Sequence, residues 1–203
     1  MTDPRAGIND LTTKARIRNA ALDLYAEQGE DRVSMRTVAA AAGVAVGLVQ
    51  HHFKTKDGLR DAVERLIVDY HAQAIAQVPD DGSPGDVAAA RDAAVRAMLE
   101  THPTVVNYLR RALLDPKGNG GRLLTRLTEL TRVEIARLRG AGLASTSRPE
   151  SAQVIGLMVR QVGHLFLQPM VDAMWEQLTE PGTPPEGKPE LSVTIRDPSP
   201  RPA

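Results

Sequence analysis

The chain has 203 residues, of which 42% are hydrophobic, and its 25 basic and 25 acidic side chains give a formal net charge of zero. This length and composition exclude a disordered chain, and the absence of cysteine excludes disulfide bonds and thiolate metal sites. Because the molecule as a whole is not basic, any binding of nucleic acid must come from local charge, and residues 1–60 hold only nine Lys and Arg against seven Asp and Glu.

Four helices are predicted in the first 78 residues. Apolar residues at helical spacing predict three of them, which span residues 13–28, 44–53 and 57–78. Between the first two, Ser34 can cap a further short helix through its hydroxyl group. Gly43, which can adopt positive φ, is expected to end that helix.

A loop at residues 79–84 separates these helices from a second helical region. Ser83 and Asp86 have the spacing of a capping box, with Pro84 at the first helical position. Four more helices are predicted at about residues 85–101, 103–115, 119–140 and 149–178, separated by turns that include Pro116 to Gly118. Ser147 and Glu150 suggest another capping box before the last of them.

Both ends of the chain differ from the helical part in composition. From Glu180 the sequence holds seven prolines in 24 residues and is predicted to be largely disordered, with Leu191 to Ile195 as a weak candidate strand. The N-terminus is polar, and no apolar stretch approaches the roughly 18 residues of a membrane span. We therefore expect a soluble, cytoplasmic protein.

A short helix, a glycine turn and a second short helix have the form of a helix-turn-helix, whose second helix enters the major groove of DNA. On that second helix, Val49 and Phe53 are one turn apart and are predicted to face inward with Leu48. Small and hydrogen-bonding residues occupy the opposite face: Val46, Gly47, Gln50, His51 and Lys54. Glutamine can pair with adenine through two hydrogen bonds. Spacing alone leaves a second interpretation open, a solvated face on an ordinary helical hairpin.

The stretch from Arg16 to Val63 resembles the N-terminal domain of the tetracycline-repressor (TetR) family, especially in SMRTVAAAAGV at 34–44 and GLVQHHFKTKDGL at 47–59. The resemblance implies base contacts from Arg36, Val46, Gly47, Gln50 and His51. It implies phosphate contacts from Ser34, Thr37, His52 and Lys56. Alternatively, Ser34 serves only as a helix cap and His52 only bridges helices. Ala45 departs from the family, which often has a capping Ser or Thr there.

The resemblance also implies an all-α fold with two functional domains. A helix-turn-helix DNA-binding domain is expected over residues 1–56, and a helical ligand-binding and dimerisation domain over 57–179, with 57–78 as the connector and 180–203 as a tail. The segment 154–168 is apolar nearly all round, which predicts burial on several sides. We expect the helix at 149–178, which contains this segment, to form the dimer interface, so that a charge at Leu157 or Leu165 separates the subunits.

Isolated polar side chains in this apolar second region predict a small-molecule site. The candidate ligand-binding residues are Met98, His102, Tyr108, Arg111, Leu127, Gln161 and His164. The alternative is that the polar members among them are satisfied within the dimer interface or reach solvent.

The sequence therefore predicts a homodimeric transcriptional regulator that binds double-stranded DNA at an inverted repeat and is released by a small-molecule effector. Repression is the usual outcome in the family, and the sequence does not distinguish it from activation. An effector-independent DNA-binding protein is the alternative. A helical-bundle enzyme is disfavoured because the sequence contains no HExxH, GxSxG or phosphate-loop pattern. No catalytic residue, metal, cofactor or membrane partner is predicted.

Overall fold

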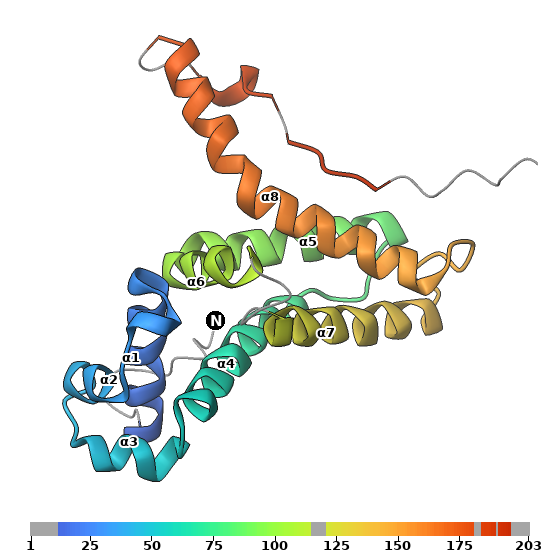
Figure 1. Cartoon of the computed structure of the whole chain (residues 1–203). Helices are drawn as coiled ribbons and strands as arrows, with labels where there is room; N and C mark the ends of the chain where they lie inside the picture. Colours follow the sequence, from blue (N-terminus) through green and yellow to red (C-terminus); the bar gives the residue numbers. More distant parts are fainter. Residues whose placement is uncertain (1–11, 115–120, 181–183, 190, 196–203) are drawn as a thin grey trace, which may run out of the picture. The chain divides into compact units, whose positions relative to one another are not determined.

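The computed structural model describes residues 12–114, 121–180, 184–189 and 191–195, and the structured elements among them are all helical (Figure 1). The α-helices are α1 (Thr13–Gln28), α2 (Met35–Ala41), α3 (Val46–Phe53), α4 (Lys56–Ala76), α5 (Pro84–Thr101), α6 (Pro103–Leu113), α7 (Gly121–Gly140) and α8 (Glu150–Leu178). Two short 3₁₀ helices, η1 (Glu30–Arg32) and η2 (Pro185–Gly187), follow α1 and α8. The all-α prediction is confirmed.

Local sequence signals explain where most helices begin and end. The Ser83 hydroxyl accepts a hydrogen bond from the Asp86 amide at 3.3 Å, and the Asp86 carboxylate accepts one from the Ser83 amide, as the predicted capping box requires. The pKa of Asp86 is lowered first by a hydrogen bond that the Ser83 hydroxyl donates to its carboxylate and then by the one from the Ser83 amide. The capping box predicted for α8 is wrong, because Pro149 precedes that helix without a side-chain cap and Ser147 bonds to Ser145 instead. The predicted turn at Pro116 to Gly118 lies outside the described residues.

The chain divides into two compact units, residues 1–127 and 128–203. This division differs from the functional boundary expected after residue 56, because α4 to α6 pack with the first three helices in one unit. The functional boundary remains a prediction.

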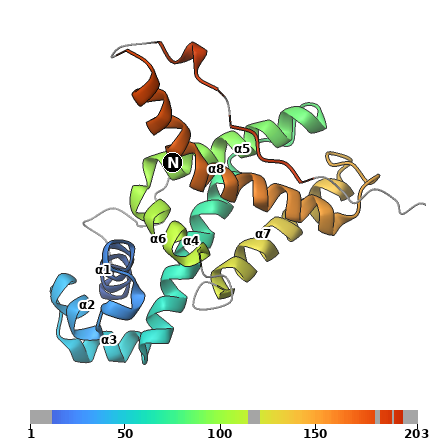
Figure 2. The same ribbon diagram turned by 45° about the horizontal axis from the view of Figure 1, so that its top comes forward.

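The core of the first unit is built around α1 and α4. Fully buried side chains from the first four helices meet there: Ile17, Leu22, Val38, Val49, Leu59, Val63 and Ile67. Figures 1 and 2 show α1, α2 and α3 gathered at the N-terminal end of α4. The first three helices are thus held as one body, from which α4 leads away.

The second unit contains the rest of α7 and the long helix α8. Val154, Met158 and Leu165 are buried, and the Thr131 hydroxyl lies 3.2 Å from the Met158 sulfur. Pro169 has no amide hydrogen to donate within α8, and Figure 1 shows the helix changing direction along its length.

Two sequence expectations about the end of the chain are wrong. By length and composition, α8 is long and apolar enough to cross a membrane, although no such stretch was expected. Only 11% of that apolar window is buried, and the rest of it is half-exposed or exposed. Residues 191–195 form no strand within the described chain. The remaining parts of the tail, residues 181–183, 190 and 196–203, lie outside the described residues, as do residues 1–11.

Candidate nucleic-acid interface

The turn between α2 and α3 is fixed by backbone and side-chain hydrogen bonds. At the start of α2, the Ser34 hydroxyl caps the helix by accepting a hydrogen bond from the Thr37 amide at 3.1 Å. At the other end, Gly43 has φ of 64°, and the amides of Gly43 and Val44 donate to carbonyls in the last turn of α2. The Arg16 guanidinium adds a hydrogen bond of 2.6 Å to the Ala42 carbonyl. The turn is therefore held by hydrogen bonds to the last turn of α2 and by Arg16 from α1.

One face of α3 is buried and the other is open. Val49 and Phe53 are buried, as predicted, while Gln50 and His51 on the other side of the helix are exposed. Val46 is 37% exposed. The prediction that Leu48 faces inward is wrong, because it is 43% exposed. Adjacent helical residues are about 100° apart, so Leu48 lies too far round the helix to share the buried face with both Val49 and Phe53.

The residues expected to contact phosphate surround this face. Ser34 and Thr37 are exposed at the start of α2, and their hydroxyl oxygens lie 2.8 Å apart. His52 is half-buried, with its ring in edge contact with His51 and Phe53. Arg36 and Gly47 are exposed, and Ala45 makes no side-chain cap for α3. The structure brings all nine predicted DNA-contacting residues to one end of the first unit, and their contacts with DNA remain predictions.

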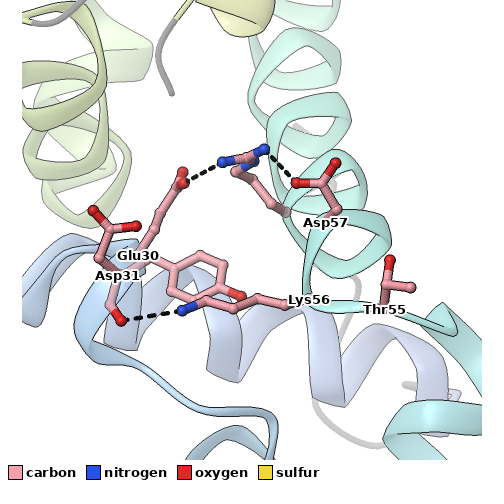
Figure 3. A pocket seen from close by; sticks show the side chains of 7 residues that line it. Glu30, Asp31, Thr55, Lys56 and Asp57 are labelled. Carbon is pink, nitrogen blue, oxygen red and sulfur yellow. Dashed lines mark hydrogen bonds and ion pairs between the residues drawn. The ribbon is translucent and has the colours of Figure 1, made fainter. Parts of the chain in front are cut away.

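A cavity of about 400 Å³ lies beside Lys56, between α1, η1 and the start of α4. Lys56 donates a hydrogen bond of 3.2 Å from Nζ across it to the Asp31 carbonyl (Figure 3). Arg60 bonds to Glu30 at 3.2 Å and to Asp57, so the charges lining the cavity are largely paired with one another. Burial, followed by the nearby Glu30 carboxylate, raises the pKa of Tyr25 to about 12.

The corner between α3 and α4 depends on Lys54, which sequence analysis placed on the outward face of the helix, and on Gly58, which it did not single out. Lys54 has φ of 64° and ψ of −55°, and the Thr55 amide donates to the Phe53 carbonyl at 2.7 Å across it. This is the tight three-residue turn that L-residues adopt only under strain. A Cβ on Gly58 would overlap the Phe53 carbonyl oxygen. Gly58 lies in the stretch 47–59 that resembles the family, but its role becomes visible only from the close approach of the Phe53 carbonyl at the end of α3.

Of the seven candidate ligand-binding residues, two have polar groups that bind the end of α1. Tyr108 donates a hydrogen bond from its hydroxyl to Glu30, and Arg111 donates to the carbonyls of Ala26 and Glu27, both at 2.8 Å. Burial and the Glu30 carboxylate raise the pKa of Tyr108. These contacts favour a structural role for Tyr108 and Arg111, in which they hold α6 against α1.

The other five candidates are divided between the two units. Met98 and Leu127 are buried in the first unit. The Nδ1 atom of His102 lies 2.8 Å from the Met98 carbonyl oxygen. The His102 and Tyr70 ring centroids are 4.5 Å apart. Gln161 and His164 are half-buried in the second unit. That these residues line one effector site stays a prediction.

The sequence profile described as "Bacterial regulatory proteins, tetR family" matches residues 17–63, which form most of α1, all of α2 and α3, and the first turns of α4. This N-terminal part of the chain is therefore similar to the DNA-binding domain of the tetR family. The proteins that this profile describes are regulatory proteins.

Two tetR-like relatives come from Mycobacterium tuberculosis. The HTH-type transcriptional regulatory protein RaaS is 45% identical over 60 residues, which cover 30% of this chain and 28% of RaaS. The HTH-type transcriptional repressor Rv3405c is 37% identical over 101 residues, which cover 50% of this chain and 46% of Rv3405c. The similarity thus spans less than half the length of these relatives.

The fold likeness extends further than the sequence likeness. A transcriptional regulator from Rhodococcus sp. RHA1 has a crystal structure that superposes with a TM-score of 0.64 at 24% identity, covering 81% of this chain and 87% of that protein. At this identity the comparison establishes a shared fold over most of the chain, and nothing about what it binds.

Proposed function

We propose that this chain is a tetR-family, sequence-specific DNA-binding transcriptional regulator, with α3 as the helix that enters the major groove. The observation that carries this proposal is the open face of α3. Its exposed side chains are short or hydrogen-bonding, and the helix is fixed by the turn at Gly43 and the corner at Gly58. A groove about 12 Å wide admits such a helix.

Base contacts are assigned to Arg36, Val46, Gly47, Gln50 and His51. Leu48 joins them because its exposed side chain suits apolar contact with a thymine methyl group. Phosphate contacts are assigned to Ser34, Thr37, His52 and Lys56. Lys56 needs only to exchange the Asp31 carbonyl for a phosphate oxygen, because its ammonium group is half-exposed at the cavity edge.

We further propose that the regulator is a cytoplasmic homodimer that reads an inverted repeat with half-sites about 34–36 Å apart or somewhat more. The support for a dimer is a row of exposed apolar side chains along α8, which we call the α8 stripe: Ile155, Val159, Leu167, Met170, Met174 and Leu178. Leu165 is already buried in a single chain, so a charge there would disturb the fold rather than test the interface.

Repression is the proposed outcome of DNA binding, and the name of Rv3405c as a repressor supports it. Release by a small-molecule effector completes the proposal. It rests on the family and on the buried apolar helices after α4.

Gln50→Ala and Lys56→Ala test the assignment of the reading face, because the two side chains are proposed to touch different parts of DNA. Loss of a bidentate base contact costs about 1–3 kcal/mol and relaxes preference at one position of each half-site. Loss of a phosphate contact weakens all sequences alike and lowers the salt slope by about one per contact. The measurement is selection of bound sequences by the purified protein, followed by fluorescence anisotropy at several salt concentrations.

Glu27→Ala, at an exposed position on α1, is the control and should alter neither quantity. An unchanged base preference in Gln50→Ala would show that another face reads the DNA. Unchanged salt dependence in Lys56→Ala would show that Lys56 makes no phosphate contact and donates only to the Asp31 carbonyl.

A further inference from the structure

The segment that follows α8 turns back and lies along that helix (Figures 1 and 2). Gly187 packs against Trp175, where an added Cβ would lie 3.3 Å from the indole ring. Next to it, the Lys188 ammonium forms an ion pair of 2.7 Å with Asp172. Farther along, Val193 rests on Gly163, where an added Cβ would lie 2.8 Å from a Val193 methyl group. The order of these contacts makes the segment antiparallel to α8.

Chain length allows both of the last two contacts at once. Nine helical residues separate Asp172 from Gly163, a rise of about 14 Å. Five residues separate Lys188 from Val193, and a chain of that length can reach about 17 Å. We call the described residues 187–189 and 191–195 the strap across α8.

The contact at Gly163 lies on the α8 stripe. Val159, Gly163 and Leu167 follow one another at intervals of four residues, so they lie on the same apolar face of α8. Lys188 and Trp175 mark contacts on another side of the helix, so the strap crosses from that side onto the stripe. Val193 then occupies a place in the stripe where a missing side chain lets a second chain approach closely.

We infer that the strap and a second copy of this chain compete for the middle of the α8 stripe. This inference rests on the proposed homodimer. Both occupants bury the same apolar surface, and Val193 cannot remain on Gly163 while a helix of another subunit packs there. Because both subunits must release their straps, the apparent affinity between them falls in proportion to the square of the fraction of chains in which the strap is undocked.

Val193→Asp tests the competition and leaves the sequence of α8 intact. The matched control is Thr194→Asp, which introduces the same charge at the neighbouring exposed residue. Trp175 is the only tryptophan, so its emission and its quenching by acrylamide report the docking of the strap beside it. We expect Val193→Asp to shift the emission to longer wavelength and to increase quenching, and Thr194→Asp to leave both unchanged.

The second measurement is the dimer dissociation constant by sedimentation at several protein concentrations. If the strap is docked nine-tenths of the time in each chain, its release from both subunits tightens the dimer about 100-fold in Val193→Asp, and a chain ending at residue 183 behaves alike. A weaker dimer in both forms would overturn the competition and make the strap part of the interface. Unchanged Trp175 emission with unchanged association would overturn the docked strap itself. Monomers in every form, wild type included, would overturn the competition together with the proposed dimer.

Discussion

Gly58 and Lys54 determine how the proposed recognition helix is joined to α4. The Phe53 carbonyl lies against the Cα of Gly58, and Lys54 holds a positive φ between them. Backbone in this conformation stores strain that the surrounding packing must offset. The corner is therefore set by close approach of two helices rather than by any side chain that contacts DNA.

Gly58→Ala should destabilise the fold and thereby weaken DNA binding. Its methyl group meets backbone, which cannot move aside as a flexible side chain could, so we expect a loss of about 1–3 kcal/mol in the free energy of unfolding, measured by urea denaturation. Gly47→Ala is the matched control, because nothing lies within 4 Å of a Cβ at that exposed helical position. That variant should keep or slightly gain stability while altering affinity for DNA. Equal stability in the two variants would contradict the proposed role of Gly58.

At the scale of elements, polar side chains of α6 and α4 bind the C-terminal end of α1 and the following helix η1. Arg111 supplies hydrogen bonds to the last carbonyls of α1, which a helix leaves without internal partners. Glu30 in η1 receives both Tyr108 from α6 and Arg60 from α4. Movement of either helix must therefore displace the end of α1.

Glu64 adds a charge cluster between α4 and the start of α7. Its side chain is only 1% exposed, and within the described chain neither carboxylate oxygen accepts a hydrogen bond. Arg60, Arg122 and Arg126 lie at 3.7–3.9 Å, too far for good hydrogen bonds. Burial is the largest influence on the pKa of Glu64 and raises it, in spite of these arginines.

Because the folded pKa of Glu64 is raised, its contribution to stability is present below the unfolded pKa and is lost as pH rises through the folded pKa. We expect Glu64→Gln to gain stability relative to the wild type as pH rises from about 4 to 7.5, since the glutamine carries no buried charge. The measurement is thermal or urea unfolding across that range. Glu100→Gln, at an exposed position on α5, should show no such trend. A constant difference between Glu64→Gln and the wild type would mean that the arginines fully compensate for burial.

At the scale of the whole molecule, the exposed α8 stripe determines the proposed assembly. Met174→Asp places a charge where apolar surface is expected to be buried between subunits, at a cost of several kcal/mol if it is left unpaired. We expect monomers by sedimentation and loss of operator binding. Glu176→Lys changes charge at an exposed position away from the stripe and should remain dimeric. A dimeric Met174→Asp protein would move the interface off the stripe.

The proposed effector makes a thermodynamic prediction that needs no knowledge of its position. An effector that releases DNA must bind the DNA-free arrangement more tightly, and DNA must weaken effector binding by the same factor, typically about 5–150-fold. Calorimetric titration of a discovered effector with and without operator measures this factor. Equal affinities would show that the compound occupies the protein without regulating it, and would favour an effector-independent DNA-binding protein.

The sequence by itself determined the features that depend on neighbouring residues. Helical periodicity predicted α1 and α8 to within a residue, and the capping box at Ser83 and the positive φ at Gly43 followed from local chemistry. The buried face of α3 at Val49 and Phe53 followed as well, since three- and four-residue spacing defines a face. These features need no knowledge of what lies across the molecule.

Only the tertiary structure decided what each polar side chain meets. Tyr108 and Arg111 looked like ligand donors in an apolar helix, yet their partners lie 78 to 85 residues away at the end of α1. Leu165 and the neighbouring positions of α8 were equally apolar in sequence, but one side is buried in a single chain and the other is exposed. A run of apolar residues specifies that a helix must be covered. Which face is covered, and by which segment, depends on packing between residues distant in sequence.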